Sequence, residues 1–562
     1  PAQALRAAGL TGPLQALRLA AASGGRAVYL ATPVPAQVPA RTVVVDAATG
    51  TRLAHADAAH AQASALAFQA QMPPDSAALV PPQYLGEIGE DAFTHSRALD
   101  THRPLHKLQL HDAAATVLYV SSQTGEVVRD APRHERAWNY LGAWLHWLYP
   151  LRGGALGPYW TAIVDGLSLL GIALAQKLPV VLFAEGGGGR PGDTDIPVVA
   201  GLHVHTFAAY AALSGQVPVV GIAHGRCFAG NAALLGCSDA IIATRASTIG
   251  MGGPAMIEGG GLGVFTPEQV GPSGVQHANG VIDILVDDEA QAVAAAKQYL
   301  AFFQGRSTDW AAPDTRLLRQ VVPENRLRAY DTRAAMAHLV DVGSLLPLRT
   351  GFGVGIHTAL ARIEGRPVGL LANNPAHLGG AIDADAADKA ARFMQLCNAH
   401  GLPLVSLVDT PGFMVGPDTE KTAQVRHVSR LFVTAAKLRV PYFSVVLRKG
   451  YGLGAMGMTA GSFHAPVFNV AWPTGEFGAM GLEGAVRLGF RKELEALPEG
   501  AERDALFQKL LARQYAHGEA LHMASTLEID AVIDPADTRA WLARGLAGSR
   551  VREVGAGFVD TW

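Results

Sequence analysis

Apolar and polar residues alternate in short runs along the first third of the chain, and this pattern predicts antiparallel strands. Two runs show it most clearly: residues 41–53 read RTVVVDAATGTRL, and residues 116–128 read TVLYVSSQTGEVV. In each, a Thr-Gly turn separates two short stretches, which is typical of a β-hairpin. The proline-rich residues 72–82 lie between the two runs and are predicted to be a linker.

A longer apolar run follows at residues 160–175, which read WTAIVDGLSLLGIALA. Trp144, Trp147 and Tyr149 precede it, as aromatic residues do at a membrane interface. With 16 residues the run is slightly shorter than the roughly 17 to 25 that span a bilayer. Two interpretations stay open: a membrane helix, or a buried helix of a large α/β domain.

From residue 176 onward the chain contains an internal repeat. KLPVVLFAEGGGGRPG matches GLPLVSLVDTPGFMVG, VPVVGIAHGRCFAGNAA matches VPYFSVVLRKGYGLGAMGM, and STIGMGGPAMIEG matches GEFGAMGLEGAV. An apolar strand, a glycine-rich loop and a helix recur in this order, which indicates βαβ units in a parallel sheet, built as two homologous domains. The matched positions are Glu185 with Asp409, Gly192 with Gly416, Gly225 with Gly450, and Met251 with Met480.

Length, charge and cysteine content narrow the class of protein. The 562 residues suffice for three or four domains, and 45 basic against 48 acidic residues leave a net charge of −3. So balanced a charge argues against a nucleic-acid partner. Cys227, Cys237 and Cys397 form no CxxC pair, and His203 and His205 lack a third ligand at metal spacing. We therefore expect no disulfide framework and no metal site.

The glycine loops are the candidate sites of chemistry. Unpaired N–H groups at the start of a helix can hold an anion. If that anion is an enolate forming on a thioester oxygen, the loop is an oxyanion hole, worth about 3 to 4 kcal/mol per donor. The alternative is that the glycines only permit tight strand-to-helix turns.

These segments resemble the carboxyltransferase (beta) subunit of biotin-dependent acyl-CoA carboxylases of the propionyl-CoA and acetyl-CoA type. The resemblance rests on AEGGGGRPGDTD, GRCFAGNAALLGCSDAIIATRASTIGMGGPAMIEGGGLGVF, GRPVGLLANNP, DKAARFMQLCNAHGLPLVSLVDTPGFMVG and WPTGEFGAMGLEGAV, and it runs from about residue 174 to about residue 546. It implies an α/β fold of two crotonase-like (ClpP/crotonase) domains and a homo-hexamer with active sites at dimer interfaces. The first domain would bind acyl-CoA and the second carboxybiotin.

The resemblance also implies roles for individual residues. Gly187 and Gly188 would donate N–H groups to the acyl thioester oxygen, and Leu453 and Gly454 to the biotin ureido oxygen. Most of the family reads G-G-A at 452–454, so the second pair can shift by one residue. The residues expected to bind the acyl-CoA substrate are Gly186, Gly189, Arg190, Gly225, Ala229, Gly230 and Met456. The residues expected to bind biotin are Pro411, Gly412, Phe413, Gly452 and Ala455.

The implied reaction moves a carboxyl group from carboxybiotin to the α-carbon of an acyl-CoA. Carboxybiotin releases CO2, the biotin anion takes the α-proton, and the enolate captures the CO2, so no protein acid or base is required. Glu185 and Asp409 are accordingly interpreted as loop or cap residues, and Cys227 is not expected to be a nucleophile. Arg190 and the Arg448-Lys449 pair either face CoA phosphates or face solvent.

Two partner subunits are expected. The chain has no EAMKM-like biotinylation motif and no ATP-grasp glycine loop. Biotin carboxylase and the biotin carboxyl carrier protein should therefore be separate chains.

Residues 20–175 resemble the PepSY family, small α+β modules of bacterial envelope proteins. HRPLHKLQLHD, LYVSSQTGEVVRD and ERAWNYLGAWLHWLYPL carry this resemblance. The predicted domains are a PepSY-like region with an apolar helix at 160–175 (1–175), an incomplete first carboxyltransferase domain (176–345) and a second one (346–562). The first carboxyltransferase domain is predicted to be incomplete because nothing in residues 127–177 matches residues 351–401 of the second carboxyltransferase domain.

Three functional hypotheses follow. The first is the carboxyltransferase component of an acyl-CoA carboxylase. The second is a biotin-dependent decarboxylase subunit coupled to a membrane pump, and the third is an envelope PepSY module with an inactive carboxyltransferase remnant. The carboxyltransferase part is expected to be cytoplasmic, with membrane association only through residues 144–175.

Overall fold

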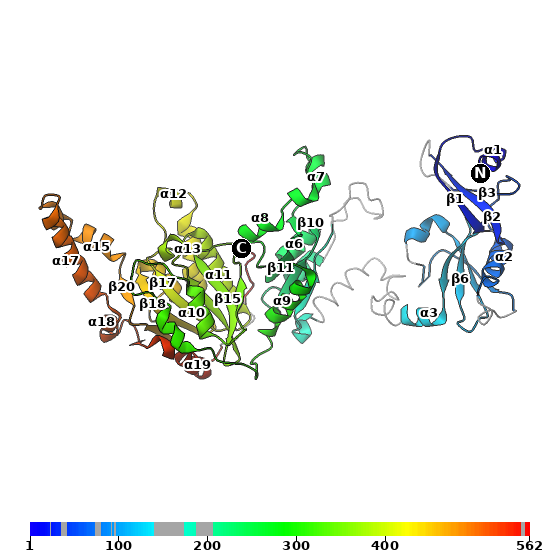
Figure 1. Cartoon of the computed structure of the whole chain (residues 1–562). Coiled ribbons are helices and arrows are strands. Elements are labelled where there is room, and N and C mark those ends of the chain that lie inside the picture. Colours follow the sequence, from blue (N-terminus) through cyan, green and yellow to red (C-terminus); the bar gives the residue numbers. More distant parts are fainter. Residues whose placement is uncertain are drawn as a thin grey trace. The chain divides into compact units, whose positions relative to one another are not determined.

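The computed structural model describes residues 1–22, 24–34, 42–72, 80–91, 93–94, 97–139, 173–186, 206–551 and 557–562. The chain divides into two compact units, Pro1–Val164 and Asp165–Trp562, and each is considered by itself (Figure 1). Most of the predicted linker at 72–82, the predicted helix at 160–175 except for its last three residues, and the three tryptophan and tyrosine residues before it lie outside the described residues. Within the described part, no helix is long and apolar enough to cross a membrane.

The first unit begins with a three-stranded antiparallel sheet. Its order is β1(Leu14–Ala22)-β2(Arg26–Pro33)-β3(Val43–Asp46), and α1(Ala2–Ala7) packs on it through Leu5. At the end of β3, Asp46 Oδ1 accepts the N–H groups of Ala48 and Thr49 at 2.9 Å each, which stabilises a tight turn. The hairpin predicted at 41–53 is thus a strand followed by a single bridge between Val45 and Arg52.

A second sheet of four antiparallel strands follows in the same unit. Its order is β4(Gln83–Ile88)-β5(Leu105–Gln109)-β6(Val117–Ser121)-β7(Val127–Ala131). The helix α2(Ala58–Gln69) is capped by the Asp57 carboxylate and packs Ala61 and Ala65 against Leu108 and Leu118. Strands β6 and β7 form the hairpin predicted at 116–128. The described residues of this unit also form η2(Arg97–His102) and α3(Arg133–Asn139).

The first half of the second unit contains a four-stranded parallel sheet. Its order is β13(Ile284–Val286)-β11(Ala240–Thr244)-β9(Val219–Ala223)-β8(Val180–Phe183). The strands β10(Arg226–Phe228) and β12(Thr248–Gly250) form a separate parallel pair. The helical segments are α5(Thr206–Ala211), α6(Gly230–Gly236), α7(Pro254–Gly259), η7(Pro267–Gln269), α8(Ser273–Ala278) and α9(Glu289–Ala301). The strands are parallel, as the repeat predicted.

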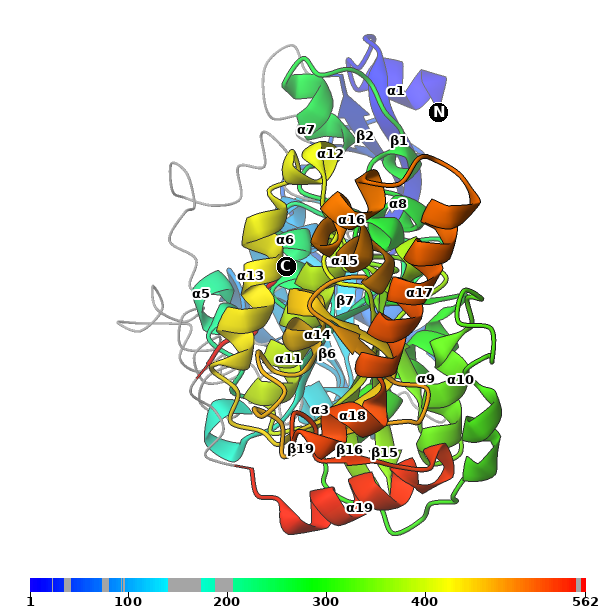
Figure 2. The same cartoon turned by 90° about the vertical axis from the view of Figure 1, so that its left-hand side faces the viewer.

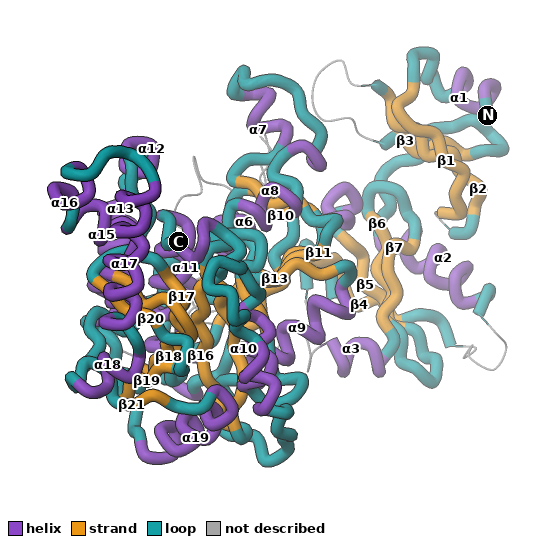
Figure 3. The backbone as a smooth tube through the Cα atoms, turned by 60° about the vertical axis from the view of Figure 1, so that its left-hand side comes forward, coloured by secondary structure: helices purple, strands orange, loops and turns teal. Residues whose placement is uncertain are grey.

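The second half contains an eight-stranded sheet. Its order is β14(Leu346–Leu348)-β15(Ile356–Ile363)-β16(Arg366–Asn373)-β17(Leu404–Thr410)-β18(Tyr442–Tyr451)-β19(Phe468–Ala471)-β21(Ala531–Val532), and β20(Glu476–Gly478) also pairs with β18. Strands β16 to β19 lie side by side (Figure 3) and are parallel. The helical segments are η8(Thr315–Gln320), α10(Thr332–Leu339), η9(Leu378–Gly380), α11(Ala384–Ala399), α12(Pro417–Glu420), α13(Gln424–Ala435), α14(Gly452–Met458), α15(Leu482–Gly489), α16(Arg491–Glu495), α17(Ala501–His517), α18(Ala520–Ser525), η10(Pro535–Asp537) and α19(Thr538–Gly548).

Helices cover both faces of this larger sheet. Side chains of α11 pack with Leu404 and Val408 on one face, and side chains of α10 and α19 pack with Val405 and Leu407 on the other. In turn, α13 packs against α11 and α14 (Figure 2). All seven residues of β17 are buried, as expected for a parallel strand enclosed by two helix layers.

The matched strands of the two halves have different surroundings. β17 lies between β16 and β18, whereas β8 pairs only with β9 among the described residues. Val181 and Phe183 of β8 are correspondingly 39% and 56% exposed. Within the described chain, the first half has no counterpart of β14, β15 and β16.

Buried polar contacts join the two halves of the second unit. Arg392 on α11 donates to the carbonyl of Asp239 at 2.8 Å, and His400 Nε2 lies 2.8 Å from Asp239 Oδ2. Arg349 pairs with Asp283 at 3.0 Å. Apolar residues of both halves also belong to one hydrophobic core. The described parts of the two halves are therefore joined by buried polar and apolar contacts.

Candidate active site

In the second half, two parallel strands bring two glycine loops together. β17 ends at Thr410 and leads into Pro411-Gly412-Phe413, while β18 ends at Tyr451 and leads directly into α14. The carboxyl ends of neighbouring parallel strands meet at one edge of a sheet, which is where such sheets bind ligands. The sequence alone predicted both loops, and the structure places them in contact.

The contact between the loops requires glycine at position 454. A Cβ atom there would lie 2.6 Å from the carbonyl carbon of Gly412 and 3.0 Å from the Phe413 nitrogen. Gly412 has φ +127°, and its N–H donates to Thr410 Oγ1 at 3.1 Å. The start of α14 thus packs backbone against backbone on the loop that follows β17.

The other residues predicted to bind biotin also lie where these two loops meet, but they differ in their exposure to solvent. Leu453 is exposed, whereas Gly454 and Ala455 are buried. Gly452 has φ +55°, and a Cβ there would lie 2.8 Å from the Ala479 carbonyl oxygen. Because the Ala455 side chain belongs to the hydrophobic core, its position favours supporting the loop rather than contacting a ligand.

A buried ion cluster lies beneath these loops. Asp409 is fully buried, and its Oδ2 accepts from Arg448 Nε at 3.1 Å while its Oδ1 accepts from the Lys449 N–H at 3.2 Å. Arg448 Nη1 also donates to the carbonyls of Arg326 and Arg328, at 3.0 and 2.9 Å. Burial lowers the pKa of Lys449, and the Asp409 carboxylate opposes this shift.

The position of Arg448 decides between the two interpretations of the Arg448-Lys449 pair. The Arg448 side chain is only 4% exposed, and its hydrogen bonds and ion pair are made within the chain. The interpretation that it faces solvent is therefore wrong for Arg448, and the contact with a CoA phosphate stays a prediction. The reason is that the carboxylate at 409 enters the protein core and needs a buried cation.

The first half repeats the acidic contact with different residues. Glu185 Oε1 accepts the His224 N–H at 2.9 Å and lies 2.6 Å from His224 Nδ1. His224 immediately precedes Gly225, as Lys449 precedes Gly450, so the matched acidic residues contact matched sequence positions, one just after β9 and the other near the end of β18. A Cβ at Gly225 would lie 2.9 Å from Glu185 Oε2.

The remaining described residues of the first loop surround Gly186. The Gly186 N–H donates to the Arg226 carbonyl at 2.7 Å, and a Cβ at Gly186 would lie 2.4 Å from Asn231 Nδ2. Ala229 has φ +54° and precedes Gly230, the first residue of α6. Gly187, Gly188, Gly189 and Arg190 lie outside the described residues, as does Gly192.

Cys227 lies beside this loop but is not an activated thiol. It is fully buried, and burial together with the charge of Glu185 raises its pKa to about 12. A reactive cysteine requires a lowered pKa. Among the described residues, no group of histidine, cysteine and carboxylate side chains is arranged to hold a metal ion.

A cavity of about 670 Å³ opens beside the start of α14. Met456 lines it, together with the glycines at 450 and 452. The sequence analysis did not assign the other lining side chains to the site. They are Phe463 and His464 after α14, Phe477 of β20, Leu482 of α15, His517 of α17 and His522 of α18. Of these, only Phe477 and Leu482 lie within the repeat. The cavity combines apolar walls with imidazole groups.

Comparison with known proteins decides the family. A model of the carboxyl transferase domain matches residues 153–553. The chain belongs to the carboxyl transferase family. The methylmalonyl-CoA carboxyltransferase 12S subunit of Propionibacterium freudenreichii subsp. shermanii is 33% identical over 408 residues, which cover 71% of this chain and 76% of that protein. The biotin-dependent acetyl-/propionyl-coenzyme A carboxylase beta6 subunit of Mycobacterium bovis is 32% identical over 411 residues, covering 71% and 85%.

Solved structures agree with this family. A single-chain, multi-domain long-chain acyl-CoA carboxylase has a TM-score of 0.65 and 43% identity; the match covers 95% of this chain but only 55% of the longer protein. A transcarboxylase 12S hexamer with bound methylmalonyl-CoA has a TM-score of 0.61 and 26% identity, covering 86% and 90%. The predictions of a carboxyltransferase enzyme and of a crotonase-like α/β fold are confirmed. The family match begins at residue 153, upstream of the predicted start at 174.

Proposed function

We propose that the chain transfers a carboxyl group from carboxybiotin to the α-carbon of an acyl-CoA. Membership of the carboxyl transferase family supports carboxyl transfer, and both named relatives act on acyl-CoA thioesters. The observation that carries the site is the backbone packing of Gly454 on Gly412, because it joins the start of α14 to the loop that follows β17.

In this proposal the second half receives the biotin group. The N–H groups of Leu453 and Gly454 lie in the first turn of α14, where backbone donors have no partner within the helix. They would hold the ureido oxygen as negative charge develops on it. Pro411, Gly412, Phe413 and Gly452 would shape the pocket and Ala455 would support it. Bound carboxybiotin supplies the CO2 and then the base for the α-proton.

The first half would receive the acyl-CoA. Gly187 and Gly188 follow Gly186 directly and are proposed to donate to the thioester oxygen. Gly186, Gly225, Ala229 and Gly230 form the described part of that loop, and Gly189 and Arg190 complete the proposed set. This assignment is supported by the recurrence of the same loop, with the same acidic contact, in the half that contains Asp409.

Assembly is proposed to follow the family. The transcarboxylase 12S structure is a hexamer, and the segment around α7 exposes large apolar side chains, with Met251 70% and Val264 77% exposed. Exposed apolar patches of this kind mark protein interfaces. We propose a homo-hexamer served by separate biotin carboxylase and biotin carboxyl carrier subunits.

The assignment of residues 1–175 as a PepSY-like region also remains a proposal. Two antiparallel sheets with packed helices are compatible with a small α+β module. The boundaries 1–175, 176–345 and 346–562 are proposed with it. A cytoplasmic location is proposed for the carboxyltransferase part, and association with a membrane only for residues 144–175.

The reverse half-reaction tests this function without partner subunits. The full chain should decarboxylate malonyl-CoA and methylmalonyl-CoA when free biotin is added, and it should not do so without biotin. The product acyl-CoA is measured by liquid chromatography. If protein shown to be folded and oligomeric gives no turnover with either substrate, the carboxyltransferase proposal is wrong and an inactive remnant is favoured.

Met456 is expected to set the acyl preference. Met456→Ala should enlarge the cavity beside α14 and shift the ratio of kcat/KM for methylmalonyl-CoA over malonyl-CoA by about tenfold, since one methylene in an apolar pocket changes discrimination by roughly 10- to 200-fold. Met480→Ala, at a position that does not line the cavity, is the control. An unchanged ratio in Met456→Ala would place the acyl group elsewhere.

A further inference from the structure

Tyr451 connects the start of α14 to β20, a strand within the third repeated segment to which the sequence assigned no site residue. It is the last residue of β18, it is buried, and its hydroxyl donates to Glu476 Oε2 at 2.9 Å. Glu476 is the first residue of β20, which runs parallel to the end of β18, with Glu476 opposite Lys449. The Glu476 side chain therefore contacts a residue two positions further along the neighbouring strand.

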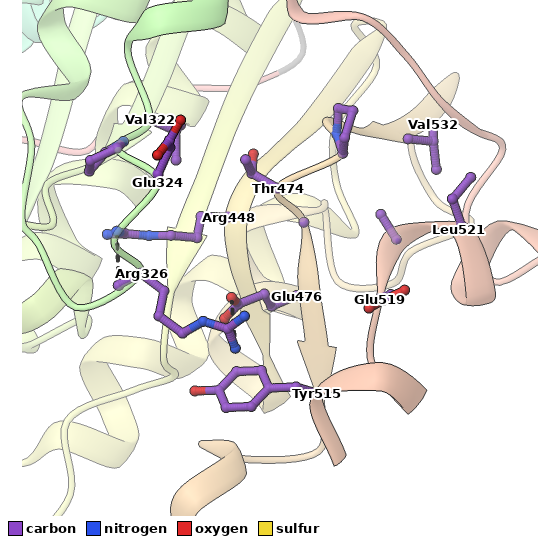
Figure 4. Close-up of a pocket in the computed structure, with 14 residues that line it drawn as sticks. Val322, Glu324, Arg326, Arg448, Thr474, Glu476, Tyr515, Glu519, Leu521 and Val532 are labelled. Carbon is purple, nitrogen blue, oxygen red and sulfur yellow. Dashed lines mark hydrogen bonds and ion pairs between the residues drawn. The ribbon is translucent and has the colours of Figure 1, made fainter. Parts of the chain in front are cut away.

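The second carboxylate oxygen of Glu476 has its own partner. Arg326 Nη1 lies 3.5 Å from Glu476 Oε1, and the Arg326 guanidinium lies 3.8 Å from the centre of the Tyr515 ring. Figure 4 shows Arg326 extending between Glu476 and Tyr515 in a pocket of about 310 Å³. The Arg326 carbonyl in turn accepts a hydrogen bond from Arg448, the partner of Asp409.

Glu476 is thus held between two groups that lead to the glycine loops. On one side Tyr451 immediately precedes Gly452 and the proposed N–H donors. On the other side Arg326 is bonded to the buried ion cluster below both loops. The start of α14 cannot absorb a movement of Tyr451 without shifting against Gly412, because Gly454 already packs there backbone against backbone. A small displacement of Tyr451 would therefore also displace the N–H groups of Leu453 and Gly454.

We propose that Glu476 is a positioning residue for the biotin-side donors. It binds the Tyr451 hydroxyl with one oxygen and Arg326 with the other, and thereby fixes the N–H groups of Leu453 and Gly454. Glu476 acts through Tyr451 and is assigned no contact with a substrate. This inference rests on the proposed function, in which the second half of the second unit binds biotin.

The kinetic test uses the full chain and free biotin. Glu476→Gln keeps the size of the side chain but weakens the acceptor for Tyr451. Hydrogen bonds to charged groups are the stronger ones, so we expect kcat/KM for biotin to fall about tenfold while KM for malonyl-CoA stays unchanged. Tyr451→Phe removes one oxygen atom and should have the same effect, and the double variant should be no worse than either single variant.

A matched control and a second readout complete the test. Tyr84→Phe removes a hydroxyl that lies 2.9 Å from His106 Nδ1 in the other compact unit, and it should behave as the wild type. Hydrogen exchange of residues 452–458 should be faster in Glu476→Gln and Tyr451→Phe, and unchanged in Tyr84→Phe.

Each outcome distinguishes the two proposals. If the wild type turns over and the exchange and biotin kinetics of Tyr451→Phe and Glu476→Gln match it, positioning by Glu476 is wrong. Equal losses for biotin and malonyl-CoA would also overturn it, because a general structural defect affects both substrates. If the wild type has no activity but exchange accelerates as expected, the contact fixes α14 and the proposed function fails.

Discussion

Alanine at position 454 is expected to reduce biotin-dependent decarboxylation by about 100- to 1,000-fold, the loss that follows removal of one oxyanion-hole donor. The new Cβ would lie 2.6 Å from the Gly412 carbonyl carbon and 2.7 Å from its Cα. Both are backbone atoms, so the strain cannot be relieved by rotating a side chain. Either α14 or the loop after β17 has to move, and the N–H groups of Leu453 and Gly454 move with it.

Gly481→Ala is the matched control for Gly454→Ala. Gly481 precedes α15 with φ −53°, and a Cβ there meets no atom within 4 Å. Its turnover should stay within about twofold of the wild type, because a substitution at an unstrained, open position has little effect. The measurement is kcat with malonyl-CoA and saturating biotin, together with thermal unfolding. If Gly454→Ala retains normal turnover, the start of α14 is not the donor site.

Removal of the Arg448 guanidinium should strongly destabilise the second unit. In Arg448→Met, Asp409 keeps a buried charge without its main partner, and two carbonyls lose a donor. Breaking a buried ion pair from one side costs about 3 to 5 kcal/mol of unfolding free energy. The expected loss is measured by urea denaturation followed by tryptophan fluorescence, which reports on the buried Trp472 of the same half.

Arg333→Met provides the comparison for Arg448→Met. Arg333 pairs with Asp331 at 2.8 Å, but both side chains are exposed. An exposed pair contributes only about 0 to 1 kcal/mol. A similar small loss in Arg448→Met would show that water or another cation compensates Asp409, contrary to the packing described above.

The parts of the fold that repeat are predictable from sequence. β8 and β17 both begin just after a Leu-Pro pair and β9 and β18 just after a Val-Pro pair, so the two parallel sheets follow from matching segments alone. The family resemblance assigns Pro411 to Phe413 and Gly452 to Ala455 to one site, and the parallel strand ends bring these two loops together. Family comparison confirms the carboxyltransferase prediction.

Two of the side chains around Glu476 were not predictable, because they come from segments outside the repeat. Arg326 follows η8, and Tyr515 lies on α17, yet both lie at the pocket that contains Glu476. Neither segment has a motif that marks a site, and Arg326 and Glu476 are more than 100 positions apart. The same limit explains the error on Arg448: its sequence neighbours gave no sign that Asp409 was buried beside it.

The predicted hairpin at 41–53 shows a different limit. The turn itself was correctly predicted, since Asp46 organises the turn after β3. However, the second stretch forms only one bridge, because β3 has four residues and ends at Asp46, where the turn begins, so few residues remain to extend the pairing. Local pattern specifies a turn more reliably than it specifies how long the following strand is.

The unequal surroundings of β8 and β17 have a consequence for substitution. Val181 and Phe183 of β8 are partly exposed, whereas the matched Val405 and Leu407 of β17 are buried. A buried charge without a partner is costly, and an exposed one is not. Lysine at position 181 or 183 should accordingly be tolerated better than lysine at position 405 or 407, although the two strands repeat one another in sequence.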